Sequence, residues 1–183
     1  GFKVIAYRIV VANAARVSKK IIAVSDFTRK DIMDTLKTNR SKIEVIYEAS
    51  DDMKVSNKKE EKIKNYFLYV GNVFQHKNVG LLLESFKSLV KEDPTLRLVF
   101  VGSNDFLYKK LKEHVKKNMG NDKVIFLENV SDEKLSELYR GANALVRTSL
   151  MEGFSLPPLE ALENECLVLA SDIPVHREVF VDS

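Results

Sequence analysis

Short apolar runs alternate with amphipathic segments over most of the chain, and this alternation restricts the fold more than any other feature. The apolar runs are YFLYVG, LRLVFVG, KVIFLE, NALVRTS and CLVLAS, and they all lie between residues 66 and 171. Helical patterns such as NVGLLLESFKSLVKED and DFLYKKLKEHVKKNM separate them. Short, continuous, β-branched strands with amphipathic crossovers are typical of a parallel sheet covered by helices on both faces. We therefore predict an α/β fold.

The first third of the chain has its own elements. Residues 2–17 place Ile5 and Ile9 at helical spacing, and KIIAVSD predicts a buried strand that ends at a Ser/Asp pair able to cap a helix. That helix is predicted from about Thr28 to Leu36, and SKIEVIYEAS is the next predicted strand. The charge-dense stretch after it predicts a linker over residues 52–64. Residues 65–183 would then form a Rossmann-like domain, with a parallel sheet flanked by helices.

The composition suits a globular protein of one or two domains. The chain has 183 residues, of which 45% are hydrophobic and 30% are charged. Its single cysteine, Cys166, lies in an apolar run, which excludes a disulfide framework and predicts a core thiol in a reducing compartment. No apolar run approaches the roughly 20 residues that a membrane-spanning helix needs.

Positive charge is concentrated at the front of the chain. Residues 1–64 contain 15 basic and 9 acidic residues, a net charge of +6, whereas the remainder has 14 basic and 17 acidic residues, a net charge of −3. Such a front third could contact an anionic membrane, but an ordinary solvated face is the simpler interpretation.

The predicted sheet indicates which loops to inspect for a binding site. Ligands of such sheets bind beyond the carboxyl ends of the strands, here in the loops 71–78, 102–105, 128–132 and 149–157. The chain contains neither G-x-G-x-x-G nor the P-loop motif, which disfavours a standard dehydrogenase or kinase. It also lacks D-x-D, C-x-x-C and H-E-x-x-H, and its three histidines are far apart, so no dedicated metal site is expected.

The loop GNVFQHKN is a candidate anion site. Gly71 permits close approach of the backbone, and Lys77 stands just before a helix predicted to begin near Asn78. A lysine and the unpaired amides of a helix N-terminus both favour an anion. The alternative is that Asn78 caps the helix and Lys77 is simply exposed. His76 alone is interpreted as a loop residue.

The segment EGFSLPPLE, residues 152–160, predicts a second loop that runs into a helix. Pro157 and Pro158 fit only the first turn of a helix, so the segment before them must turn and present its amides outward. Glu152 in the loop and Glu160 near the helix start can face the same mouth of the sheet. A carboxylate there can accept both hydroxyls of a ribose. For Glu160 the alternative is a favourable interaction with the helix dipole, which needs no ligand.

The segment EGFSLPPLEALENECLVLAS resembles the E-x7-E segment of the nucleotide-sugar-dependent glycosyltransferases of family 4. These enzymes have the GT-B fold, two Rossmann-like domains that face each other. YFLYVGNVFQHKN is similar to the family's donor-phosphate loop, and IIAVSDFTRKDI and KIEVIYEASD are similar to the end of its N-terminal domain. The resemblance covers nearly the whole chain.

The resemblance implies roles for individual residues. Glu152 would be the catalytic residue beside the transferred sugar, Glu160 would hold the ribose, and Lys77 would face the diphosphate. The other implied donor-binding residues are Asn72 and the backbone of Phe154, Ser155 and Leu156, and Val130 and Asp132 would contact the base.

The implied activity is that of a retaining hexosyltransferase. It would move a hexose from a nucleoside diphosphate sugar, of the UDP or GDP type, to a hydroxyl of a glycan or lipid-linked acceptor in polysaccharide biosynthesis. No metal, other cofactor or nucleic acid is expected, and the location would be cytoplasmic, with peripheral association at the inner face of the membrane as a further expectation. Residues 1–51 would be the end of the N-terminal acceptor domain, and residues 65–183 a nucleotide-sugar-binding domain that is incomplete at its C-terminus. The alternatives are a non-catalytic nucleotide-sugar-binding module and an oxidoreductase that binds nicotinamide.

The chain departs from the family's pattern at several positions. Asn72 stands where the family often has Arg, so Lys77 would carry more of the charge interaction with the diphosphate. Ser155 replaces a usual Gly and is expected to narrow the pocket slightly. Glu165 and Leu167 replace the usual Gly and Pro, which leaves the end of the helix open.

Overall fold

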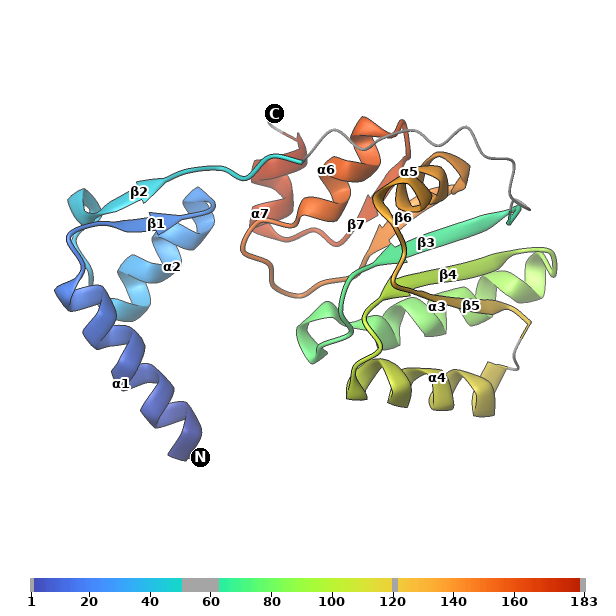
Figure 1. Cartoon of the computed structure of the whole chain (residues 1–183), viewed down its shortest axis with the longest axis horizontal. Coiled ribbons are helices and arrows are strands. Elements are labelled where there is room, and N and C mark those ends of the chain that lie inside the picture. Colours follow the sequence, from blue (N-terminus) through green and yellow to red (C-terminus); the bar gives the residue numbers. More distant parts are fainter. Residues whose placement is uncertain (1, 51–62, 120–121, 182–183) are drawn as a thin grey trace.

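The computed structural model describes residues 2–50, 63–119 and 122–181 (Figure 1). Five strands form one parallel sheet in the order β5-β4-β3-β6-β7. They are β3 (Tyr66–Val70), β4 (Arg97–Gly102), β5 (Val124–Glu128), β6 (Ala144–Arg147) and β7 (Val168–Ala170). The predicted α/β fold with a parallel sheet is confirmed, and each of the five apolar runs supplies one strand.

Helices cover both faces of this sheet. Figure 1 shows α3 (Val79–Glu92) and α4 (Phe106–Met119) on one face, and α5 (Asp132–Gly141) and α6 (Leu156–Glu163) on the other. The first pair buries a core around Tyr69, Phe86 and Phe100, and the second pair buries a core around Leu68 and Leu145. Cys166 lies in the second core, as predicted for a core thiol.

The order of the strands creates one reversal point in the sheet. From β3 the chain proceeds outward to β4 and β5, then returns to place β6 on the other side of β3 and continues to β7. The loops that leave β3 and β6 therefore run to helices on opposite faces of the sheet. In open α/β sheets this switch point is where ligands bind.

The N-terminal unit, residues 2–50, forms a separate small layer beside the sheet (Figure 1). It contains α1 (Phe2–Val17), β1 (Ile21–Ala23), α2 (Asp26–Leu36), a 3-10 turn (Arg40–Lys42) and β2 (Ile43–Val45), with β1 and β2 paired in parallel. Helix α2 begins two residues before the predicted Thr28, because Ser25 acts as the N-cap and accepts the Thr28 amide at 3.0 Å. Ile5 and Ile9 are on a helix as predicted, but both are exposed.

The N-terminal unit contacts the sheet domain near the short helix α7 (Pro174–His176) and the π-helical turn Arg177–Val181 that follows it. Val24 and Phe27 pack against the buried side chains of Phe154 and Val175. The predicted linker over 52–64 lies outside the described residues, apart from its last two. Among the helices of the described ranges, none is long and apolar enough to cross a bilayer.

Candidate active site

The loops that leave β3 and β6 meet at the switch point of the sheet. The amide of Leu150 donates to the carbonyl of His76 at 2.8 Å, and the Thr148 hydroxyl donates to the carbonyls of Lys77 at 3.0 Å and Asn78 at 3.1 Å. These bonds join segments about 70 residues apart in the chain. They fix the position of Lys77 relative to the loop that carries Glu152.

Glu152 lies at the centre of this junction and is bound on both carboxylate oxygens. Its Oε2 accepts from Lys77 Nζ at 2.5 Å. Its Oε1 accepts from Arg147 Nη2 at 2.5 Å and from the Ser149 hydroxyl at 2.7 Å. The Glu152 side chain is only 7% exposed, and that of Arg147 only 2%. The structure therefore brings together Lys77 and Glu152, as the sequence predicted, and adds Arg147 and Ser149, which sequence reasoning missed.

Two cations share one anion in this cluster, and the pKa values follow from that imbalance. Burial alone would raise the pKa of Glu152, but the hydrogen bonds from Lys77 and Ser149 and the charge of Arg147 outweigh burial and hold that pKa below its ordinary value. Burial lowers the pKa of Lys77, and repulsion from Arg147 adds to this, so its pKa stays below the ordinary value despite the pairing with Glu152. The cluster has one surplus positive charge at the rim of the sheet.

The alternative interpretation of the Lys77 loop was right that Asn78 stands at the N-cap position of α3 and wrong that Lys77 is simply exposed. Asn78 is the N-cap residue of α3, but it has a left-handed backbone, with φ 51°, and its side chain makes no capping hydrogen bond. Lys77 is not simply exposed, because its side chain is 11% exposed and paired with Glu152. His76 is exposed, but it lies in the short 3-10 helix Gln75–Lys77 and not in the predicted loop.

Helix α6 begins at the site as its prolines predicted. Its first residue is Leu156, and Pro157 and Pro158 follow in the first turn. Ser155, the N-cap residue, has φ 89° and ψ 84°, and its side chain does not cap the helix. Among the described residues the buried Ser155 hydroxyl has no hydrogen-bond partner. The helix therefore begins with amides that no side chain of the cap residue satisfies.

Glu160 lies one residue beyond the first turn of α6, and its carboxylate accepts from the Tyr139 hydroxyl of α5 at 2.7 Å. Burial raises the pKa of Tyr139, the Glu160 charge raises it further, and the charge of Arg147 opposes this. No hydrogen bond or ion pair joins Glu160 to Lys77 or Glu152 within the described part of the chain.

The remaining predicted residues are distributed around the site. Asn72 follows β3, and its carbonyl accepts from the Tyr69 hydroxyl at 2.5 Å. Phe154 is buried against the N-terminal unit, so only its backbone could serve a ligand. Val130 packs on the core under α5, and Asp132 is the exposed first residue of that helix, at the edge strand β5. The structure does not bring Val130 and Asp132 to the Lys77–Glu152 pair.

A second layer of hydrogen bonds supports the loop behind Glu152. The Ser171 hydroxyl donates to the carbonyl of Ser149, and the Ser171 carbonyl accepts from Nδ1 of the buried His176 at 2.8 Å. Because the carbonyl is an acceptor only, Nδ1 carries the proton of the neutral ring. Burial lowers the pKa of His176. Its Nε2 has no partner among the described residues.

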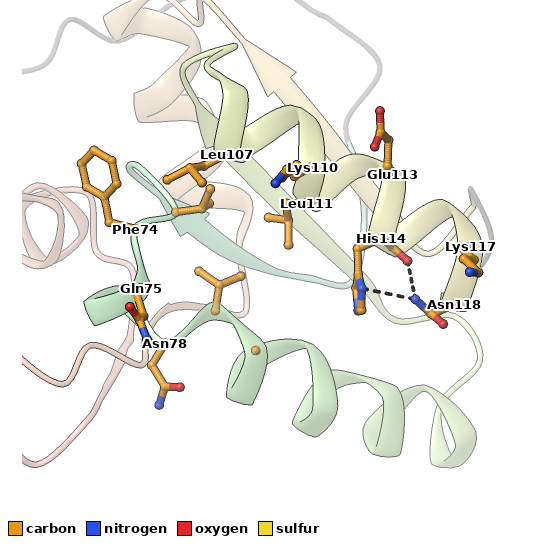
Figure 2. A pocket seen from close by; sticks show the side chains of 13 residues that line it. Phe74, Gln75, Asn78, Leu107, Lys110, Leu111, Glu113, His114, Lys117 and Asn118 are labelled. Carbon is orange, nitrogen blue, oxygen red and sulfur yellow. Dashed lines mark hydrogen bonds between the residues drawn. The ribbon is translucent and has the colours of Figure 1, made fainter.

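A hollow of about 780 Å³ lies beside the Lys77 loop, on the face of the sheet covered by α3 and α4 (Figure 2). Phe74, Gln75 and Asn78 border it on one side, and residues of α4 from Leu107 to Asn118 border it on the other. None of the predicted site residues lines it. Within the described ranges, no group of three or more His, Cys, Asp or Glu side chains could hold a metal ion.

Arg147 could have been noticed in the sequence. It is the one charged residue in the apolar strand NALVRTS, and it comes directly before the loop that carries Glu152. A charge at the carboxyl end of a buried strand requires a counter-charge, because an unpaired buried charge is costly. Ser149 gave no comparable signal, since serine is common in loops.

Comparisons with known proteins agree with this architecture. Residues 50–183 match the family described as glycosyl transferases group 1. The chain is 34% identical over 176 residues to the O-antigen chain mannosyltransferase RfbU of Salmonella typhimurium, covering 96% of this chain and 48% of that protein. It is 37% identical over 117 residues to the serotype-specific mannosyltransferase WbdA of Escherichia coli, covering 62% of this chain and 14% of that protein.

A solved structure has the same fold as this chain. Anabaena Alr3699/HepE, crystallised with UDP and glucose, superposes with a TM-score of 0.76 at 18% identity, covering 93% of this chain and 49% of that one. The chain thus spans about half the length of RfbU and of HepE. Three observations on this chain indicate the same family. They are its parallel sheet, the acid-bearing segment at the start of α6 and the family match over most of its length. The chain belongs to the group 1 glycosyl transferases, which have the GT-B fold.

Proposed function

We propose that this chain is the donor-binding part of a retaining glycosyltransferase of family 4 that transfers a hexose from a nucleoside diphosphate sugar to a hydroxyl acceptor. The observation that carries the proposal is the Lys77–Glu152 ion pair at the switch point of the sheet, where this fold binds ligands. The names of RfbU and WbdA, both mannosyltransferases, support mannose as the hexose. The UDP in the HepE structure supports a nucleoside diphosphate of the UDP or GDP type.

In this proposal the leaving diphosphate occupies the rim beside Lys77. The negative charge that develops on it is stabilised by Lys77 and by the amides at the start of α6, from Phe154 to Leu156. Asn72 supplies a neutral contact where relatives often have Arg. Because the positive charge comes from the protein, the proposal includes no catalytic metal or other cofactor.

The two glutamates have different tasks. Glu160 accepts the ribose hydroxyls in place of the Tyr139 hydroxyl that it binds in the free protein. Glu152 orients hydroxyls of the transferred sugar and does not attack the anomeric carbon. Val130 and Asp132 remain candidates for the base.

The acceptor is proposed to be a glycan or a lipid-linked sugar of polysaccharide biosynthesis. A lipid-borne acceptor would bring the enzyme to the cytoplasmic face of a membrane. The net charge of +6 over residues 1–64 supports attraction to anionic lipid at that face. Vesicle sedimentation with and without anionic lipid tests this point separately.

Titration calorimetry with UDP, GDP, ADP and NADH tests the donor site. We expect one of the nucleoside diphosphates to bind and Glu160→Ala to weaken it by about 1.5 to 3 kcal/mol, the range for hydrogen bonds to a charged group. Glu163→Ala, which removes an exposed carboxylate from the same helix, is the matched control and should leave binding unchanged. Equal binding by wild type and Glu160→Ala would contradict the ribose role, and binding of NADH instead would favour an oxidoreductase.

A non-catalytic binding module is the second candidate, because the chain spans about half the length of its relatives. Donor hydrolysis or transfer separates the two functions. Turnover by a protein that contains this chain, lost in Lys77→Met, supports the transferase.

A further inference from the structure

Arg147 is a buried guanidinium with a fixed position. Its side chain is 2% exposed, and its Nη1 donates to the carbonyl of Val70 at 2.7 Å, at the end of the neighbouring strand β3. The guanidinium carbon lies 5.6 Å from the centre of the Tyr69 ring. Gly71, with φ 131°, passes so close that an added Cβ would lie 3.3 Å from Nη1. The end of β3 is thus shaped around this side chain.

Arg147 and Lys77 bind different oxygens of Glu152. Arg147 shares Oε1 with Ser149, whereas Lys77 is the partner of Oε2. Lys77 is also the more exposed cation, and it lies at the end of the short 3-10 helix Gln75–Lys77 rather than on a strand. A lysine is a point charge on a flexible stem, whereas the planar fork of an arginine holds a fixed geometry. The two cations are therefore suited to different tasks.

We infer that Arg147 is a positioning residue that holds Glu152 charged and fixed through Oε1 while Oε2 exchanges Lys77 for a hydroxyl of the donor sugar. This inference rests on the proposed function, in which Lys77 turns to the diphosphate. Without Arg147, the departure of Lys77 would leave a buried carboxylate with Ser149 as its one remaining protein donor among the described residues, and burial would favour its protonation. A protonated or displaced Glu152 could not orient the sugar. Arg147 acts through Glu152 and does not contact the donor.

A double-mutant cycle between Arg147 and Glu152, made in the chain 1–183, tests the inference. Calorimetry measures the affinity of each variant for the nucleoside diphosphate sugar and, separately, for the same nucleoside diphosphate without the sugar. Arg147→Met should weaken the sugar nucleotide roughly 10- to 100-fold, as expected when a hydrogen bond to a charged group is lost. In a protein that already carries Glu152→Gln, adding Arg147→Met should not weaken the sugar nucleotide further. Arg147→Lys in the wild-type background should bind the sugar nucleotide more tightly than Arg147→Met does. Arg97→Met, which removes an arginine from the opposite end of β4, is the control.

The state of the Glu152 carboxyl group gives a second readout that needs no donor. The groups whose charge acts on it are Lys77 and Arg147, and Tyr69 and His176 are near enough to feel its charge. We expect the carboxyl ¹³C signal of Glu152 at pH 6 to remain that of a carboxylate in Lys77→Met and to become that of an acid when Arg147→Met is added.

The outcomes separate this inference from the proposed function. If the wild type binds no nucleoside diphosphate sugar, the proposed function fails. The NMR result still shows whether Arg147 keeps the Glu152 carboxyl group ionised. If the sugar nucleotide binds and Arg147→Met weakens it equally in the Glu152→Gln background, Arg147 contacts the donor directly and the inference is overturned. If Arg147→Met does not fold, two other variants decide whether Arg147 acts through Glu152. They are the double variant Arg147→Met/Glu152→Gln, which removes both charges, and Arg147→Lys.

Discussion

At the scale of single residues, two positions where the resemblance to the family led us to expect glycine carry other residues in a left-handed backbone. Ser155 has φ 89° and Glu165 has φ 57°. A left-handed conformation costs a non-glycine residue roughly 1 to 2 kcal/mol. The open question about the end of α6 is thereby answered, because Glu165 adopts the conformation that glycine would adopt, and the chain turns into the strand after it. The strain at Ser155 lies directly beside the proposed donor site.

Ser155→Gly should stabilise the chain by roughly 0.5 to 1 kcal/mol. The energy gained by relief of the left-handed strain exceeds the entropic cost of folding a glycine, which has more conformational freedom in the unfolded chain. The Ser155 hydroxyl has no partner among the described residues, so little is lost with it. Urea unfolding measures the difference. Ser131→Gly is the control, since Ser131 caps α5 at φ −72° and its loss should destabilise slightly. A loss of stability in Ser155→Gly would contradict the strain argument.

The depressed pKa of Glu152 predicts how stability depends on pH. A carboxyl whose folded pKa lies below its unfolded value stabilises the protein above the unfolded value, near 4.5, and this contribution is lost as pH falls through the folded pKa. The urea midpoint of the wild type should therefore fall more steeply between about pH 6 and pH 3 than that of Glu152→Gln. Glu163→Gln, which removes an exposed carboxylate from helix α6, should follow the wild type. Parallel curves for wild type and Glu152→Gln would refute the prediction.

At the scale of elements, helix α2 is capped from the far end of the chain. Glu178 accepts the amides of Asp26 at 2.6 Å and Phe27 at 2.9 Å, and also the Tyr47 hydroxyl at 2.9 Å. Burial would raise the pKa of Glu178, but these hydrogen bonds lower it overall. The Ser25 hydroxyl, at the same helix end, donates to the carbonyl of Gly153, the residue after Glu152, at 2.6 Å. The N-terminal unit is thus joined directly to the loop of the candidate site.

Glu178→Ala should destabilise the contact of the N-terminal unit by about 1.5 to 3 kcal/mol, the range for hydrogen bonds to a charged group. Hydrogen exchange should quicken in α2 and β1 and stay unchanged in β3 and β4. Asp172→Ala is the control, because the exposed Asp172–Arg177 pair contributes little. Unchanged exchange in α2 would show that Glu178 does not hold the two parts together.

At the scale of the whole molecule, the two sheets differ greatly in support. The strand β3 has a partner on each side and buried cores on both faces. The strands β1 and β2 are three residues each, and within the described residues they pair with each other and with no further strand. Two short strands are marginal without further packing. This asymmetry makes the sheet domain the stable frame of the site.

Native-state hydrogen exchange should therefore be slowest in β3, β4 and β6 and much faster in β1 and β2, since local opening follows the buried contacts. The exchange rates of the individual amides, measured by NMR, check this. Protection of β1 and β2 equal to that of β3 would contradict it.

Much of the fold could be predicted because it depends on local pattern. The five apolar runs, the amphipathic helices and the prolines of α6 each indicate their element within a window of a few residues. The helix over residues 2–17 was predicted in the same way, yet the exposure of Ile5 and Ile9 could not be, because burial depends on what packs there. At the site, motif spacing indicated Lys77, Glu152 and Glu160, but it did not indicate their further partners, which are Arg147, Ser149 and Tyr139.

The sequence by itself determined the class of sheet, the loops at its carboxyl edge and the start of α6, because hydrophobic periodicity and the fixed φ of proline act locally. Only the tertiary structure decided that β6 lies beside β3, with Leu68 opposite Leu145, and so brings Arg147, Lys77 and Glu152 into one buried cluster. Strand order depends on packing between segments about 75 residues apart, and no local pattern encodes it. For the same reason, the partner of Glu160 proved to be Tyr139 on another helix.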